Sequence, residues 1–133
     1  MQAFDSLSRY SPQALGLLRI VTALIFIAHG TQKLLGFPAA PASGLPAIFT
    51  IYWFAGVLEL FGGLAILVGF MTRPVAFILC GQMAFAYWMG HASRGPFPVL
   101  NGGDAAILYC FIFLYIFTAG AGAWSMDGNR SKA

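Results

Sequence analysis

One carboxyl group stands out among the residues that could do chemistry in this 133-residue chain. Glu59 lies near the middle of residues 48–70, a stretch that contains no other charged residue. Such a stretch is long enough to cross a bilayer, which takes about 20 apolar residues. A carboxyl group at that depth costs about 2.5–3.5 kcal/mol on insertion scales. Glu59 is therefore expected to have a polar partner inside the protein, or a function that uses it.

Further polar groups lie in the apolar segment that precedes Glu59. At about 100° per residue, Arg19, His29 and Lys33 fall on one face of a helix. Helical rise places Glu59 between Arg19 and His29 in depth, within about 8 Å of each along the helix axis. Gln82, on a third apolar segment, falls at nearly the depth of Glu59. We expect Glu59 to bond with at least one of Arg19, His29 and Gln82.

The clustering of these groups predicts a cavity between the first three apolar segments. We expect its wall to include His29, Lys33 and Glu59, and its mouth to open toward the outer half of the membrane. His29 suits proton exchange there, and the permanent charge of Arg19 suits an anionic ligand. An alternative stays open, in which an Arg19–Glu59 pair only fixes the register of two helices. His91 is interpreted as a solvated residue at the membrane boundary.

Composition sets the class of protein and the elements that must position these groups. Hydrophobic residues make up 59% of the chain and charged residues 8%, against about 25% charged residues in a soluble domain. This predicts an integral membrane protein in which the spans are helical, because lipid offers no partner for unpaired backbone groups. We expect an all-α, antiparallel four-helix transmembrane bundle in a single domain, residues 1–133. Its spans are placed at about residues 14–35, 48–70, 74–91 and 104–124.

The distribution of basic residues predicts the orientation of the bundle. An even number of spans places both termini on one side of the membrane, and the positive-inside rule makes that side the cytoplasm. The Pro/Gly-rich loops 36–47 and 93–103 then face outward, and the protein is a multi-pass protein of the inner (plasma) membrane. The expected inner side carries Arg9, Arg19, Arg73, Arg130 and Lys132, and the outer side carries Lys33 and Arg94.

Several functions are not supported by the sequence. The basic residues are spread over loops and tails, so we expect no nucleic acid as a partner. The two histidines lie at different depths without a ligand-like spacing, so no metal site is expected. Cys80 and Cys110 are placed roughly 15 Å apart along the membrane normal, which is too far for a disulfide. The chain therefore offers no redox centre of its own.

Two motifs resemble those of a known family. Arg19 followed by residues 27–34 (IAHGTQKL) resembles the "R…hG..K" signature in the first span of DoxX-like membrane proteins. Residues 59–73 (ELFGGLAILVGFMTR) are similar to the "E..gG..l..G..tr" segment of the same family. The resemblance covers about residues 15–124, and it implies a link to thiosulfate:quinone oxidoreductase subunits and to membrane complexes of thiol stress. The positions that match the motifs are Arg19, His29, Lys33, Glu59 and Arg73.

Three functions remain open at this stage. The first is a subunit of a membrane oxidoreductase system that binds a quinone-like or small sulfur-containing molecule and works with other redox subunits. The second is a non-catalytic accessory or assembly subunit of a membrane complex. The third is a small-molecule binding or transport protein, for which a homo-oligomer would supply the repeats that alternating access needs. For the first function we expect Glu59 and His29 to be catalytic, and the ligand-binding residues to be Arg19, Lys33, Gln82 and Arg73.

Overall fold

Residues 2–130, the part of the chain that the computed structural model describes, form helices and no strand. This confirms the all-α prediction. The long helices are α2 (Ser11–Leu35), α5 (Thr72–Gly90) and α7 (Asp104–Ala119). A further helix is built from α3 (Ile51–Val57), the π-helical turn η2 (Leu58–Gly62) and α4 (Gly63–Val68). The short elements are α1 (Gln2–Asp5), η1 (Ser6–Tyr10), η3 (Ala92–Arg94), α6 (Pro98–Asn101) and α8 (Met126–Arg130).

Three helical stretches within residues 2–130 are long and apolar enough to cross a membrane. They are Ser6–Leu35, Ile51–Val68 and Thr72–Arg94. The fourth apolar helix, α7, has 16 residues and is about 24 Å long, which is less than the roughly 30 Å of a bilayer's hydrocarbon core. Its predicted end near residue 124 is wrong, because the chain leaves the helix at Gly120, which has a φ of 93°.

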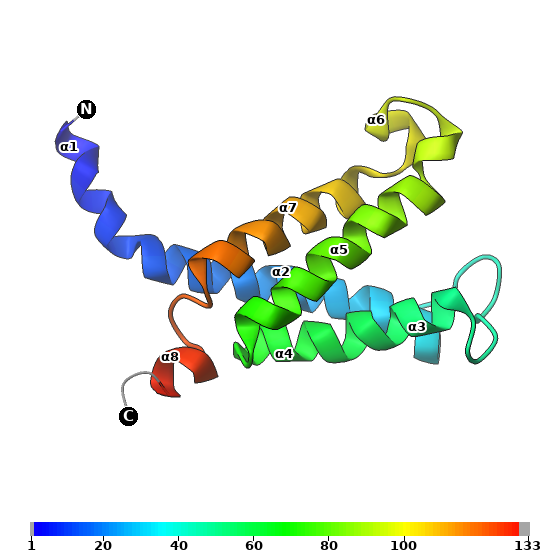
Figure 1. The fold of residues 1–133 in the computed structure, drawn as a ribbon, viewed down its shortest axis with the longest axis horizontal. Coiled ribbons are helices and arrows are strands. Elements are labelled where there is room, and N and C mark those ends of the chain that lie inside the picture. The colour runs from blue at the N-terminus through cyan, green and yellow to red at the C-terminus, as the bar shows by residue number, and fades with distance from the viewer. Residues whose placement is uncertain (1, 131–133) are drawn as a thin grey trace.

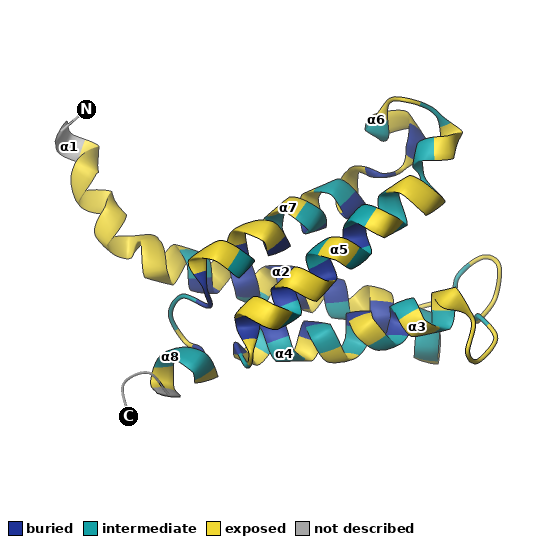
Figure 2. Cartoon of the chain, viewed as in Figure 1, coloured by how far each residue is buried: buried dark blue, intermediate teal, exposed yellow. Residues whose placement is uncertain are grey.

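The four long helices are arranged as two antiparallel pairs (Figure 1). Helix α2 packs along α3, η2 and α4, and α5 packs along α7. The pairs meet near the tight turn between α4 and α5, and they diverge toward the ends of α3 and α5 that bear the loops. The outward faces of the helices are mostly exposed (Figure 2), as expected for surfaces that contact lipid. We call the end with residues 36–50 and 91–103 the loop end, and the opposite end the termini end.

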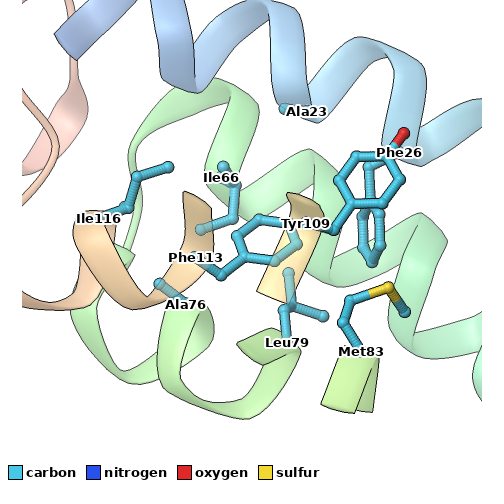
Figure 3. Close-up of a cluster of buried hydrophobic side chains, with 9 residues drawn as sticks. All are labelled: Ala23, Phe26, Ile66, Ala76, Leu79, Met83, Tyr109, Phe113 and Ile116. Carbon is cyan, nitrogen blue, oxygen red and sulfur yellow. The ribbon is translucent and has the colours of Figure 1, made fainter. Parts of the chain in front are cut away.

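The hydrophobic core lies where the two pairs meet, and it is centred on aromatic rings from α2 and α7 (Figure 3). Phe26 packs edge-on against Tyr109 and Phe113, with ring centroids 5.1 and 5.0 Å apart. Such pairs contribute about 0.5–1.5 kcal/mol beyond the area they bury. The buried core residues are Ala23, Phe26, Ile66, Ala76, Leu79, Met83, Tyr109, Phe113 and Ile116.

A buried guanidinium joins three segments at the termini end. Arg19 is fully buried, and each of its five N–H donors has a backbone carbonyl as partner. Two partners lie in the last turn of α4, so the guanidinium also faces the negative end of that helix dipole. The other three lie in residues 121–124, which turn back beneath the bundle after α7 ends. The accepting carbonyls belong to Ile66, Leu67, Ala121, Ala123 and Trp124.

The C-terminal helix α8 supplies the cap that α5 lacks. Residue Met71, at the N-cap position of α5, makes no side-chain cap. Instead, the two carboxylate oxygens of Asp127 accept hydrogen bonds from the backbone N–H groups of Met71 (3.1 Å) and Thr72 (2.8 Å). A carboxylate stabilises a helix N-terminus by filling unpaired donors and by opposing the dipole. The segment after α7 is therefore bound to both helix pairs.

Cys80 and Cys110 correct the prediction that they lie far apart. Their Sγ atoms are 3.7 Å apart across the α5–α7 contact, and both thiols are free. The predicted separation was wrong because it placed the end of the fourth span near residue 124. With α7 ending at Ala119, Cys110 lies nine residues above the end of its helix, and Cys80 lies eight residues above Thr72 at the start of α5.

Gly30 sets how closely α2 approaches the α3–α4 helix. A Cβ atom at this position would lie 2.6 Å from the backbone nitrogen of Leu60 and 3.0 Å from the carbonyl oxygen of Gly56. Both neighbours are backbone atoms, so neither can move aside as a flexible side chain would. Small residues allow this kind of close helix packing in lipid.

We expect Gly30→Ala to destabilise the protein by about 1–3 kcal/mol, the usual cost of overpacking. The measurement is thermal unfolding of the purified chain in one detergent. Gly81→Ala is the matched control, because a Cβ at Gly81 meets no atom within 4 Å and alanine favours a helix over glycine by about 1 kcal/mol. Equal melting temperatures for the two variants would contradict the close approach at Gly30.

Candidate functional site

A buried ion pair joins α2 to the α3–α4 helix near the loop end. The Lys33 ammonium lies 2.8 Å from Oε1 and 2.7 Å from Oε2 of Glu59. The Glu59 side chain is 6% exposed and that of Lys33 is 23% exposed. Charge-assisted hydrogen bonds of this length are among the strong ones in proteins. The pair therefore keeps a carboxylate and an ammonium together in a largely apolar environment.

Glu59 lies in a local distortion of its helix. The π-helical turn η2 includes Glu59, the single carboxyl group of the helix Ile51–Val68. A π-helical turn is rare and is found frequently at functional sites. Gly62, the last residue of this turn, packs against Leu79, and Gly63, the next residue, packs against Ile27. The sequence thus combines a costly charge, a widened turn and close helix contacts at one level of the bundle.

A pocket of about 540 Å³ opens between the α3–η2 segment and α5, where the helix pairs diverge. Its volume lies in the range of small-molecule sites, about 300–1,000 Å³. Most of its wall is apolar, with Phe54 from one side and Phe85 from the other. The polar side chains that line it are those of Lys33, Tyr52, Glu59, Gln82 and His91.

Gln82 brings an unusual group to this pocket. Its Nε2 donates a hydrogen bond of 3.3 Å to the carbonyl of Ala55. Its Oε1 is buried and has no hydrogen-bond partner among the described residues. A buried polar atom without a partner costs free energy, so such an atom in a native structure calls for an explanation.

His91 was not predicted as a site residue, and the structure places it in the pocket wall. Its Nδ1 lies 3.1 Å from the carbonyl oxygen of Asn101. Helical periodicity could not find this residue, because α5 ends at Gly90 and His91 has a φ of −127°. Its side-chain direction therefore depends on the loop 91–103, whose conformation the sequence pattern does not specify.

The predicted partners of Glu59 are wrong. Glu59 bonds to Lys33, whereas the donors of Arg19 are all taken by carbonyls and Gln82 bonds to Ala55. The prediction placed the outer end of the second span at residue 48, but α3 begins at Ile51, with Thr50 as its N-cap. Glu59 is consequently closer to the loop end than expected, within reach of the long Lys33 side chain.

The structure brings only part of the predicted site together. Lys33, Glu59 and Gln82 line one pocket, which contains two of the three residues predicted for the cavity wall. Its predicted opening toward the outer half of the membrane stays a prediction. His29 is exposed instead, with its ring edge-on to Tyr109 at 5.9 Å. Arg19 lies at the termini end, where its guanidinium donates to the five backbone carbonyls described above.

Arg73 is also remote from this pocket. It precedes Gln82 by nine residues along α5, which is about 14 Å. Its guanidinium donates hydrogen bonds to the carbonyls of Phe117 and Thr118 at the end of α7. It also lines a second pocket, of about 510 Å³, at the termini end. Arg73 therefore links the start of α5 to the end of α7 and does not contribute to the site around Glu59.

Comparison with known proteins identifies the family. Residues 14–92 match the family described as DoxX. The chain belongs to the DoxX family. The matched region includes every residue that lines the pocket around Glu59, from Lys33 to His91. The pocket thus lies within the part of the chain that matches the family.

Bacterial proteins are similar to this DoxX-family chain over most of its length. A protein of Haemophilus influenzae is 43% identical over 132 residues, which is 96% of this chain and 98% of that protein. The Escherichia coli inner membrane proteins YphA and YqjF are 32% and 30% identical, covering 87% and 86% of this chain and 89% of each relative. No solved structure matches the chain. With three long apolar helices, this DoxX-family chain is a multi-pass inner membrane protein.

Proposed function

We propose that this DoxX-family protein binds a small membrane-soluble molecule in the pocket between α3 and α5. The observation that carries the proposal is the buried Lys33–Glu59 pair at the wall of a largely apolar pocket of about 540 Å³. Binding sites for small molecules combine an apolar wall with a few polar groups that fix orientation. Ionisable residues inside a membrane protein commonly mark such pathways and sites. The apolar wall receives the body of the ligand, and the ion pair receives its polar head.

We also propose that α7 spans the membrane with the other three helices, as one four-span domain with its loop end outward. Helix α7 runs beside α5 from Gly103, which is close to Tyr87, to Phe117, whose carbonyl bonds Arg73. The excess of basic residues at the termini end supports a cytoplasmic location for both termini. Lys132, counted in that excess, lies outside the described residues. In this orientation the pocket opens in the outer half of the bilayer.

The DoxX resemblance supports a quinone-like ligand and a role beside other redox subunits. The pocket fits such a group, because it offers aromatic walls and a Lys33 ammonium that can donate to a ring carbonyl. A bound quinone would supply two-electron chemistry at this pocket. The chain's own residues would hold the ring, exclude water and keep a proton donor and an acceptor at its edge.

Filling the pocket from Gly81 tests the proposal directly. Gly81 lines the pocket, and a Cβ there meets no atom within 4 Å, so Gly81→Leu should occupy pocket space without displacing a helix. We expect wild-type protein in lipid nanodiscs to bind decylubiquinone saturably. Gly81→Leu should weaken this binding at least tenfold, about 1.4 kcal/mol, without lowering the melting temperature of the ligand-free protein.

The matched control is Leu108→Phe, which adds bulk to an exposed position of α7 outside the pocket. Its affinity for decylubiquinone should equal that of the wild type. Undiminished binding by Gly81→Leu would place the ligand elsewhere. Absence of saturable binding by the wild type would favour the accessory-subunit function over the ligand-binding one.

A further inference from the structure

The hydrogen-bond donors inside the pocket are largely committed to protein acceptors. Lys33 donates to both carboxylate oxygens of Glu59, and Gln82 donates through Nε2 to the carbonyl of Ala55. The Nδ1 of His91 faces the carbonyl of Asn101, and a carbonyl can only accept. A ligand therefore finds few free donors in this wall, apart from the third N–H of Lys33 and the exposed hydroxyl of Tyr52.

Acceptors, by contrast, are free. The Oε1 of Gln82 is buried with no hydrogen-bond partner among the described residues. Rotating the amide would not help, because it would point Oε1 at the carbonyl oxygen of Ala55, another acceptor. With Nδ1 donating to the carbonyl of Asn101, Nε2 of the His91 ring can serve as a second acceptor. The pocket wall therefore offers acceptors to a ligand that donates a hydrogen bond.

We infer that the ligand head carries a hydroxyl that donates a hydrogen bond to Oε1 of Gln82, as in a phenol or a hydroquinone. This inference rests on the proposed function and specifies the ligand's chemistry. A head with carbonyl or ether oxygens alone would leave Oε1 buried and unpaired. A hydroxyl can also accept a hydrogen bond from the third N–H of Lys33. Of two oxidation states of one ring, the pocket therefore selects the reduced, hydroxyl-bearing one.

A pair of ligands in which the O–H of one is replaced by O–CH3 in the other tests this effect, with Gln82→Met as the control for the added methyl group. 4-Pentylphenol and 4-pentylanisole share a ring, a tail and an oxygen acceptor, but only the phenol donates a hydrogen bond. Binding of each is measured by calorimetry to the full chain in nanodiscs, after subtraction of partition into empty nanodiscs. We expect the wild type to prefer the phenol roughly tenfold, the factor expected from one buried acceptor that is left unpaired.

Gln82→Met removes the acceptor at similar side-chain volume, and it should reduce the ratio of the two affinities to about one. The ratio is taken on one protein, so a general loss of stability in the variant cancels. Leu108→Phe should keep the wild-type ratio. Equal binding of both ligands by the wild type, or a preference that survives in Gln82→Met, would overturn the inference.

The same titrations separate this inference from the proposed function. If both ligands bind saturably and equally, and Gly81→Leu weakens both, the pocket is a ligand site without donor selection. If neither binds saturably, the proposed function itself fails. Decylubiquinol and decylubiquinone, titrated without oxygen, extend the comparison to a redox pair, with the quinol expected to bind roughly tenfold more tightly.

Discussion

Arg19→Leu is expected to abolish the folded protein. The substitution removes a fully buried guanidinium that donates five hydrogen bonds to backbone carbonyls. Hydrogen bonds to a charged group contribute about 1.5–3 kcal/mol each, and each buried carbonyl left unpaired carries a cost of its own. Total stability is only about 5–15 kcal/mol. The cost of losing the whole set is therefore as large as the total stability of a typical fold.

The measurement is the yield of monodisperse protein by size-exclusion chromatography in mild detergent. Arg19→Lys is the informative control, because it keeps the charge but offers three donors in place of a planar set of five. It should give a folded but clearly less stable protein. If Arg19→Leu melts within a few degrees of the wild type, the bonds from Arg19 to the five carbonyls do not hold the termini end together.

Lys33→Met should destabilise the protein by about 3–5 kcal/mol, because it leaves the nearly buried Glu59 carboxyl without its partner. Methionine keeps much of the side-chain length, so the loss reports the charge and not the packing. The measurement is the free energy of unfolding in a denaturing detergent titration. Glu59→Met should cost a similar amount, since it strands the ammonium.

The double variant Lys33→Met/Glu59→Met distinguishes a pair from two independent residues. Replacing both members of a buried ion pair with apolar groups is often neutral or stabilising. We therefore expect the double variant to recover most of the stability lost by either single one. Additive losses in this double-mutant cycle would show that Lys33 and Glu59 do not interact.

Composition was sufficient to predict the helical class and the approximate spans. The apolar runs are long, and lipid leaves the backbone few alternatives to a helix. The ends of the helices were less predictable. The position of Gly120 in the chain does not reveal that α7 ends there, because residues 121–124 are drawn back by Arg19, a residue about 100 positions earlier.

Part of the candidate site could also be predicted from helical regularity. Helical periodicity and depth correctly brought Lys33 and Glu59 to one cavity, because Lys33 lies in a regular helix and Glu59 in only a short π-helical distortion of one. They failed for the partner of Glu59, where a shift of three residues in the start of α3 changed which side chain is in reach. They also failed for His91, whose direction is set by a loop, and for Cys80 and Cys110, whose separation depended on the end of α7.

The bonds of Arg19 also impose an order on biogenesis. Ala121 is synthesised 102 residues after Arg19, and ribosomes add about 5–20 residues per second. The first helix therefore reaches the translocon many seconds before residues 121–124 exist. Until then its guanidinium has to be solvated by water, lipid head groups or the insertion machinery. The bonds that hold the termini end can therefore form only after residues 121–124 have been synthesised, so the buried state of Arg19 is completed late in assembly.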